Sequence, residues 1–264
     1  MWIFRLEQEK KKQLPYCLLR FHYVNFNIRV GILGMKNFEE HLASSAEAHG
    51  HLCPGQAVGV RMAMLGCRLI GLEDPAEHRQ IKRILVYVEL DRCAADAIAH
   101  VTGVRLGRRS LKFVDYGIMA ATFVNLETGS AFRILSTEEA RDLVALYAPG
   151  VREKTRQQLE AYRRMPDSVL FRVQRVGVPI RDWDLPGPTR YKATCSRCGQ
   201  VVRDRREVLV HGEPLCKPCA EGAYFRDAEE VTWPDMNWTP SPYRRPGEKV
   251  EEELVRSLPE IGTL

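Results

Sequence analysis

The feature that most constrains the fold of this chain is a pair of CxxC motifs in its C-terminal third. Cys195 and Cys198 form the first pair, Cys216 and Cys219 form the second, and 17 residues separate the pairs. Two residues between paired cysteines let both sulfurs reach one tetrahedral ion, and this spacing is typical of four-cysteine zinc sites. Because four protein ligands leave no open coordination position, we predict a structural Zn²⁺ here.

The residues around these cysteines predict a small treble-clef zinc finger over residues 188–225. Between the pairs, valines at 201, 208 and 210 predict a hairpin, and His211 with Gly212 is expected to turn the chain toward the second pair. A short helix is expected after Cys219. The finger carries seven basic and four acidic side chains from Arg190 to Glu221. With four thiolates and one Zn²⁺ its net charge falls to about +1, which argues against nucleic-acid binding.

Charge and composition divide the rest of the chain. Residues 1–34 hold six basic and two acidic side chains, which accounts for most of the chain's formal net charge of +5. We interpret them as an N-terminal arm, either an over-extended translation start or a targeting segment. A core domain is expected over 35–180, and a tail over 226–264 that contains five prolines, Trp233 and Trp238. No run is long and apolar enough for a membrane span, and no secretory signal is recognisable, so we expect a cytoplasmic protein.

Hydrophobic periodicity predicts an α+β core, with a mixed or antiparallel sheet and packed helices. Apolar spacing and capping signals predict helices over 37–49, 54–69, 92–103, 136–150 and 151–165. β-branched apolar runs predict strands over 82–91, 111–117, 118–127, 130–135 and 169–176.

The stretch HGHLCPG, residues 49–55, is the main candidate for a second site. It holds His49, His51 and Cys53, and places Cys53 at the start of a helix, where the peptide dipoles favour a thiolate. Cys93 is expected in the first turn of another helix, directly after a strand. Imidazole and thiolate, with Cys93 or Asp91 as a further ligand, suit zinc or ferrous iron. A redox pair of Cys53 and Cys93 and a plain capping turn are the alternatives. Cys17 and Cys67 are taken as small apolar residues.

The motifs HGHLCPG, DRCAADAIAHVTG and GVRLGRRSLKFVDYG, followed by the CxxC…CxxC finger, resemble the FmdE family, which is named for a component of formylmethanofuran dehydrogenase. The resemblance covers about residues 37–222. It implies a dimeric α+β core with an auxiliary zinc finger, and an association with molybdenum or tungsten formylmethanofuran dehydrogenase systems. It also implies that His49, His51, Cys53 and Cys93 form a metal-binding or active pocket.

The chain departs from the family pattern at three places. Val104 stands where members often carry a cysteine, Gly107-Arg108-Arg109 replaces a GK-type loop, and Ile118 occupies the place of a lysine. Losing a thiol and an amine near the pocket can remove chemistry while leaving metal binding intact.

Three functions follow as hypotheses. The first is a metal-binding accessory protein, a homodimer that serves a molybdenum or tungsten redox enzyme, with a structural zinc and a second metal (zinc or iron) or small ligand in the core. The second is an enzyme whose catalytic residues are Cys53 and Cys93, acting through metal-activated water or a thiolate. The third is a zinc-finger regulator that binds nucleic acid, against which the charge of the finger argues.

Overall fold

The computed structural model describes residues 36–72, 74, 76 and 80–228. Its core is built on a five-stranded sheet in the order β2-β1-β3-β4-β5. The strands are β1 (Ile84–Val88), β2 (Leu111–Phe113), β3 (Ala120–Asn125), β4 (Ala131–Ser136) and β5 (Phe171–Arg175). Strand β2 runs parallel to β1, and the other three pairings are antiparallel. The predicted α+β class with a mixed sheet is therefore confirmed.

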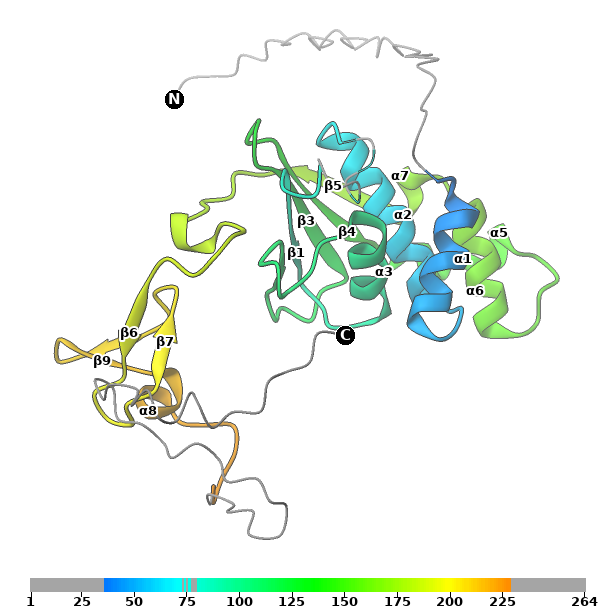
Figure 1. Ribbon diagram of the computed structural model, residues 1–264. Coiled ribbons are helices and arrows are strands. Elements are labelled where there is room, and N and C mark those ends of the chain that lie inside the picture. Colours follow the sequence, from blue (N-terminus) through cyan, green and yellow to red (C-terminus); the bar gives the residue numbers. More distant parts are fainter. Residues whose placement is uncertain (1–35, 73, 75, 77–79, 229–264) are drawn as a thin grey trace, which may run out of the picture. The chain divides into compact units, whose positions relative to one another are not determined.

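The helices gather on one face of this sheet (Figure 1). They are α1 (Phe38–His49), α2 (Pro54–Leu69), α3 (Cys93–Thr102), α4 (Glu139–Asp142), α5 (Val144–Tyr147), α6 (Lys154–Arg164) and α7 (Asp167–Leu170). Helix α2 contacts strands β3 and β4 on one side and helices α1, α3 and α6 on the others. The start of α2, and the loop of residues 50–53 before it, thus lie at the end of the helical layer where α3 begins.

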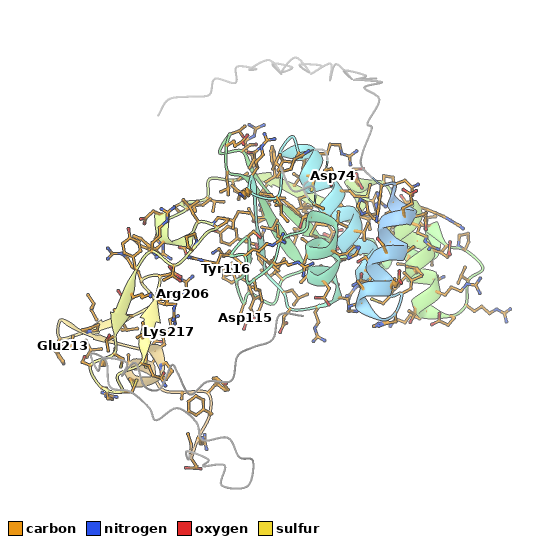
Figure 2. All side chains as sticks on the ribbon, in the orientation of Figure 1. Asp74, Asp115, Tyr116, Arg206, Glu213 and Lys217 are labelled. Carbon is orange, nitrogen blue, oxygen red and sulfur yellow. The ribbon has the colours of Figure 1, made fainter. Side chains whose placement is uncertain are left out.

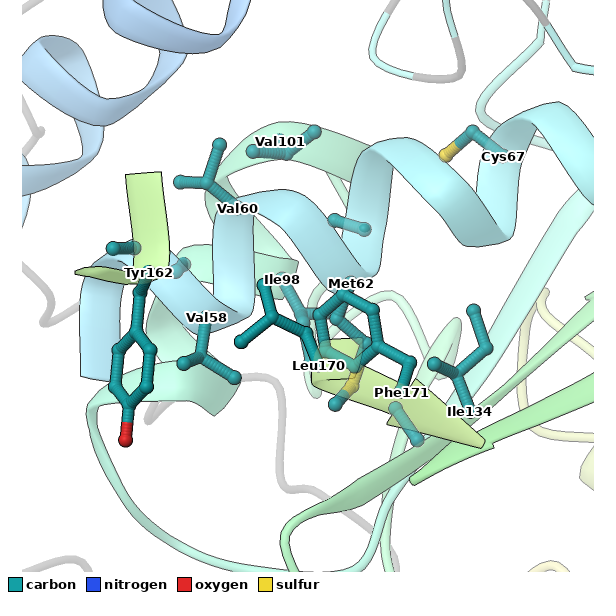
Figure 3. Close-up of a cluster of buried hydrophobic side chains, with 14 of the residues drawn as sticks. Val58, Val60, Met62, Cys67, Ile98, Val101, Ile134, Tyr162, Leu170 and Phe171 are labelled. Atoms are coloured by element: carbon teal, nitrogen blue, oxygen red, sulfur yellow. The ribbon is translucent and has the colours of Figure 1, made fainter. Parts of the chain in front are cut away.

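The main hydrophobic core lies between α2, α3 and the sheet (Figure 3). Met62, Ile98 and Ile134 are among its fully buried side chains, and Phe123 from β3 is the largest of them. Gly66 of α2 faces this ring, since a Cβ at Gly66 would stand 2.4 Å from Phe123 atoms. The missing side chain of Gly66 is what lets the helix approach the sheet so closely.

Two predicted core elements differ from the structure. The Ser/Thr–Glu signature predicts one capped helix over 136–150, but that segment forms two four-residue helices, α4 and α5, without a side-chain cap. The Thr137 hydroxyl instead donates to the backbone oxygen of Val169, 3.0 Å away, which ties the segment to α7. The strand predicted over 111–117 ends at Phe113, where the chain leaves β1.

The finger has two hairpins in place of the single predicted one. Strand β6 (Lys192–Thr194) pairs with β7 (Val201–Arg203), and β8 (Val208–Val210) pairs with β9 (Glu213–Leu215). Val201 therefore lies opposite Thr194 and not opposite Val210, because the first CxxC pair occupies the turn between β6 and β7. Helix α8 (Lys217–Glu221) begins before Cys219 and not after it as predicted, while the order of a cysteine turn, hairpins and a helix fits the predicted zinc finger. His211, at φ 52°, forms the β8–β9 turn with Gly212, as predicted.

Among the described residues no helix has the length and apolarity needed to cross a membrane. The predicted arm, Cys17 and nearly all of the predicted tail lie outside the described residues, so the domain boundaries of the chain stay predictions.

Candidate metal centres

The loop between α1 and α2 sets up the first candidate site. Helix α1 ends at His49 because Gly50 adopts φ 93°, a left-handed conformation that glycine tolerates best. Cys53 is the extended N-cap of α2 and Pro54 its first residue, where a missing N–H costs nothing. One turn of loop therefore brings an imidazole from the end of one helix beside a thiol at the start of the next.

Small residues on α2 bring the third ligand close. A Cβ at Gly59 would stand 2.6 Å from the Ala94 carbonyl oxygen, so only glycine lets the two helices approach this far. A Cβ at Gly55 would stand 3.0 Å from Cβ of Cys93 and 3.7 Å from Sγ of Cys53. The close packing that these glycines allow is thus what places Cys93, the first residue of α3, beside Cys53.

The structure gathers His49, Cys53 and Cys93 into one group, the His–Cys group. One ring nitrogen of His49 and the two sulfurs all lie within 4.8 Å of one another. All three side chains are partly buried, which shields a bound ion from part of the solvent. One nitrogen and two sulfurs are a donor set that suits zinc or ferrous iron, and three protein ligands leave a position open on a tetrahedral ion.

Asp96 holds the His49 ring in place. Its Oδ2 lies 2.9 Å from Nδ1 of His49. The other ring nitrogen, Nε2, is buried and has no hydrogen-bond partner among the described residues. A carboxylate on one imidazole nitrogen and a free lone pair on the other is the arrangement found at metal-ligating histidines. The residues present therefore fit a metal ion.

A buried amide fixes the surrounding helices. Gln56 on α2 is fully buried; its Nε2 donates to the Cys93 backbone oxygen at 2.7 Å, and its Oε1 accepts from the Ser45 hydroxyl on α1. These two bonds join all three helices that supply the His–Cys group. Such a satisfied buried amide orients its partners because breaking either bond leaves a polar group unpaired.

A hollow of about 470 Å³, here called the helix-side hollow, opens beside the group. Its lining includes His49, Cys93, Asp96, Leu106 and Phe113. Burial, followed by a hydrogen bond with Cys53, raises the pKa of the Cys93 thiol. In the absence of a metal ion, the Cys93 thiol therefore loses its proton less readily than the thiol of a free cysteine.

Other residues predicted for this site occupy different places. His51 lies outside the group of three, with its ring centroid 4.7 Å from that of His49. Asp91 lines the helix-side hollow, but Asp96 is the carboxylate that reaches His49. Cys67 is buried in the core, and burial raises the pKa of its thiol to about 12, as befits a small apolar residue.

Sequence reasoning did not find Asp96 or Gln56. Asp96 follows Cys93 by three residues on α3, a spacing that puts both on one helix face. Gln56 follows Cys53 by three residues on α2 in the same way. This shared spacing was the available signal, but polar residues in a first helical turn are common.

The second candidate lies in the finger and is here called the four-cysteine group. The sulfurs of Cys195, Cys198, Cys216 and Cys219 all lie within 4.8 Å of one another. The sulfurs of Cys198 and Cys216 are 3.7 Å apart, close to the ~3.8 Å that a tetrahedral ion with Zn–S bonds of ~2.3 Å imposes. Backbone N–H groups of Cys198 and Cys216 lower the pKa of the Cys195 thiol to about 6. The donor set fits a structural zinc.

Comparison with known proteins finds a family to which the core is similar. Residues 48–172 match the model of the family described as FmdE, molybdenum formylmethanofuran dehydrogenase operon. A protein of Archaeoglobus fulgidus named "Probable S-adenosyl-L-methionine-binding protein" is 29% identical over 203 residues. That match covers 70% of this chain and 53% of the relative, so the chain spans about half the length of the curated relative it matches.

A solved structure is also similar. It is a tungsten formylmethanofuran dehydrogenase FmdE-like protein from Syntrophus aciditrophicus, with a TM-score of 0.47 and 17% identity. The match covers 72% of this chain and 95% of that one.

Proposed function

The chain contains an FmdE-family domain, residues 48–172, and from this premise we propose that it is a metal-binding accessory protein with two metal sites. The four-cysteine group holds a structural zinc, and the His–Cys group holds a second ion, zinc or iron, with a coordination position left open. The observation that carries the second site is the buried, unpartnered Nε2 of His49, on a ring held by Asp96. An ion there satisfies that nitrogen and both neighbouring thiols at once.

The residues of the chain have separate tasks in this proposal. His49, Cys53 and Cys93 bind the ion, Asp96 orients the imidazole, and Gln56 holds the helices that present the ligands. The bound ion supplies Lewis acidity toward a ligand that enters through the helix-side hollow.

We assign the accessory role to a molybdenum or tungsten enzyme of the formylmethanofuran dehydrogenase type. The family description supports this partner, since it names the operon of that enzyme. Purification of the full chain from its own host, followed by measurement of molybdenum and tungsten in the eluate, tests it. Absence of both metals from the eluate would contradict the assignment.

We also assign a homodimer. Apolar side chains are exposed on the loops that flank β2, namely Leu106 (65%) and Ile118 (38%). A patch of this kind is often an interface. Sedimentation equilibrium of the wild type and of a Leu106→Asp variant tests the proposal, because the charge is expected to weaken the dimer and a monomeric wild type would exclude it.

The second candidate function is an enzyme that uses the same group. The helix-side hollow favours it, since a cavity of this size beside an open metal position has room for a small substrate. S-adenosyl-L-methionine belongs among the molecules to titrate, because the archaeal relative is named for binding it. Turnover that disappears in Cys93→Ser, while its metal content stays at two, would favour the enzyme over the accessory protein.

Metal content per chain is the primary test. The wild type is expected to hold two ions, a His49→Ala/Cys53→Ala variant one, and a Cys67→Ala control two. The control removes a thiol that belongs to neither group. Retention of one zinc in the double variant also shows that its finger is still folded. One ion in both wild type and double variant would overturn the core site.

A further inference from the structure

The face of the sheet that points away from the helices carries a second hollow of about 670 Å³, here called the sheet-face hollow. The register of the strands explains its floor. Lys112 on β2 lies opposite Tyr87 on β1, Tyr87 opposite Thr122 on β3, and Thr122 opposite Arg133 on β4. Paired residues share one face of a sheet, so these polar side chains form a row across four strands.

The residues next to this polar row are apolar. One residue earlier on β1, Val86 pairs with Leu111 and Phe123, and all three pack in the helix-side core. On the outer face, Leu85, Val124 and Ala131 are buried against the segment after β5, which includes Val176, Val178 and Ile180. The outer face is thus apolar and covered at one end, while the end with the polar row stays open as the hollow.

Most charges in this region are already matched. The carboxylate of Glu89, almost fully buried, accepts two hydrogen bonds of 2.7 Å from the Arg133 guanidinium. Asp184 accepts from Arg181 at 2.9 Å and from Arg206 at 3.2 Å. Both carboxylates are therefore paired with arginine side chains.

Lys112 is the exception. It lines the hollow, and within the described part of the chain it makes no ion pair. Burial lowers the pKa of its amine, and charged groups of both signs act on it, since Asp184 and Asp204 raise that pKa while Arg109 and Arg206 lower it. A partly buried ammonium that makes no ion pair gains free energy when an anion binds next to it.

The walls suit a flat ring. Tyr87, Phe113 and Tyr116 line the hollow together with Val178 and Pro179, and Tyr116 lies on the loop after β2 (Figure 2). Aromatic side chains stack on or pack edge-to-face with a ring ligand, and the volume is in the range of small-molecule sites.

We propose that the sheet-face hollow binds a small molecule that combines an aromatic ring with an anionic group. The anion pairs with the Lys112 ammonium, and the ring lies against Tyr87, Phe113 and Tyr116. No residue of the His–Cys group lines this hollow, so the proposal does not depend on the metal site.

Calorimetric titration of the full chain, zinc retained, tests this with two probes. Naphthoate presents a carboxylate on a ring, and adenosine monophosphate presents a phosphate, so the pair distinguishes the two sources of the anion. Naphthalenemethanol and adenosine keep the rings without the charge, and acetate and inorganic phosphate keep the charge without the ring. At least one complete probe is expected to bind saturably, and about tenfold more tightly than either of its halves.

Three variants locate the site. Lys112→Met is expected to weaken binding about tenfold or more, since it removes the charge and keeps the length of the chain. Tyr116→Ala, at a side chain 65% exposed, is expected to weaken binding without affecting folding. The control Lys154→Met makes the same charge change at an exposed position on α6 and is expected to bind as the wild type.

Two outcomes would overturn the proposal. One is the absence of saturable binding for both complete probes. The other is binding that Lys112→Met and Tyr116→Ala leave unchanged, because the ligand then occupies another place.

Discussion

The core and the finger are held together by different means. The core buries a contiguous cluster of apolar side chains between its helices and the sheet. The cluster of buried residues in the finger is Cys195, Leu215 and Cys216, of which two belong to the four-cysteine group. A domain that small cannot stabilise itself by burial alone, so we expect the proposed zinc to supply its folding free energy. In the core, by contrast, the proposed ion would be added to a structure that the apolar cluster already stabilises.

Removal of zinc is expected to have the largest effect and to separate the two regions. Structural zinc contributes an apparent ~10–16 kcal/mol in isolated fingers, so chelation should abolish protection of amides in β7 and β9. Amides of β1 and β3 should stay protected. Hydrogen exchange with and without chelator measures both. Loss of protection in the sheet would mean that the core also depends on metal.

Loss of a core side chain should destabilise the core and leave the finger intact. Phe123→Ala is expected to lower the free energy of unfolding of the core by about 3–5 kcal/mol, because Phe123 is fully buried against Gly66. Denaturant titration measures the loss, and the finger should keep its zinc. Phe225→Ala, at a half-exposed ring, serves as control and should change the core stability little.

The carboxylate behind His49 should affect the core metal alone. Asp96→Asn is expected to weaken core metal binding about 10–100-fold, the range found when the partner of a metal-ligating histidine is changed. Core stability should hardly move, since Asp96 is 68% exposed. Competition with a chromophoric chelator gives the affinity. Asp91→Asn, a matched charge change in the same hollow, should leave it unaltered, and equal losses in both variants would point to general electrostatics.

Lys112 should give the smallest effect. Burial lowers the pKa of its amine in the folded state, so the unfolded chain binds the proton more tightly, and the contribution of Lys112 to stability rises as pH rises through the lowered pKa. The rise levels off near pH 10.4, the ordinary pKa of a lysine. Thermal unfolding against pH should show a shallower alkaline rise in Lys112→Met than in Lys154→Met. Identical pH dependences of the unfolding temperature in the two variants would show that Lys112 does not contribute to the alkaline rise in stability.

Much of the core could be predicted because its elements carry local signals. Pro54 after Cys53 and the apolar stripe of α2 predict where that helix begins and what it packs against. The prediction for segment 136–150 is wrong, because the segment forms two short helices and the Thr137 hydroxyl bonds to Val169 instead of capping a helix. In the finger, the valines predict strands β7 and β8 but not β6 and β9, with which these two strands pair, since pairing depends on where the CxxC motifs turn the chain.

By itself the sequence determined which four cysteines of the finger come together, because two residues between paired cysteines let both sulfurs reach one point. It also determined which residues of HGHLCPG could ligate. Only the tertiary structure decided that His49 and not His51 joins Cys53 and Cys93, and that Asp96 stands behind His49. The contacts of Cys93 and Asp96 with Cys53 and His49 join residues at least 40 positions apart in the sequence, where the approach allowed by Gly55 and Gly59, and not sequence spacing, sets the distances.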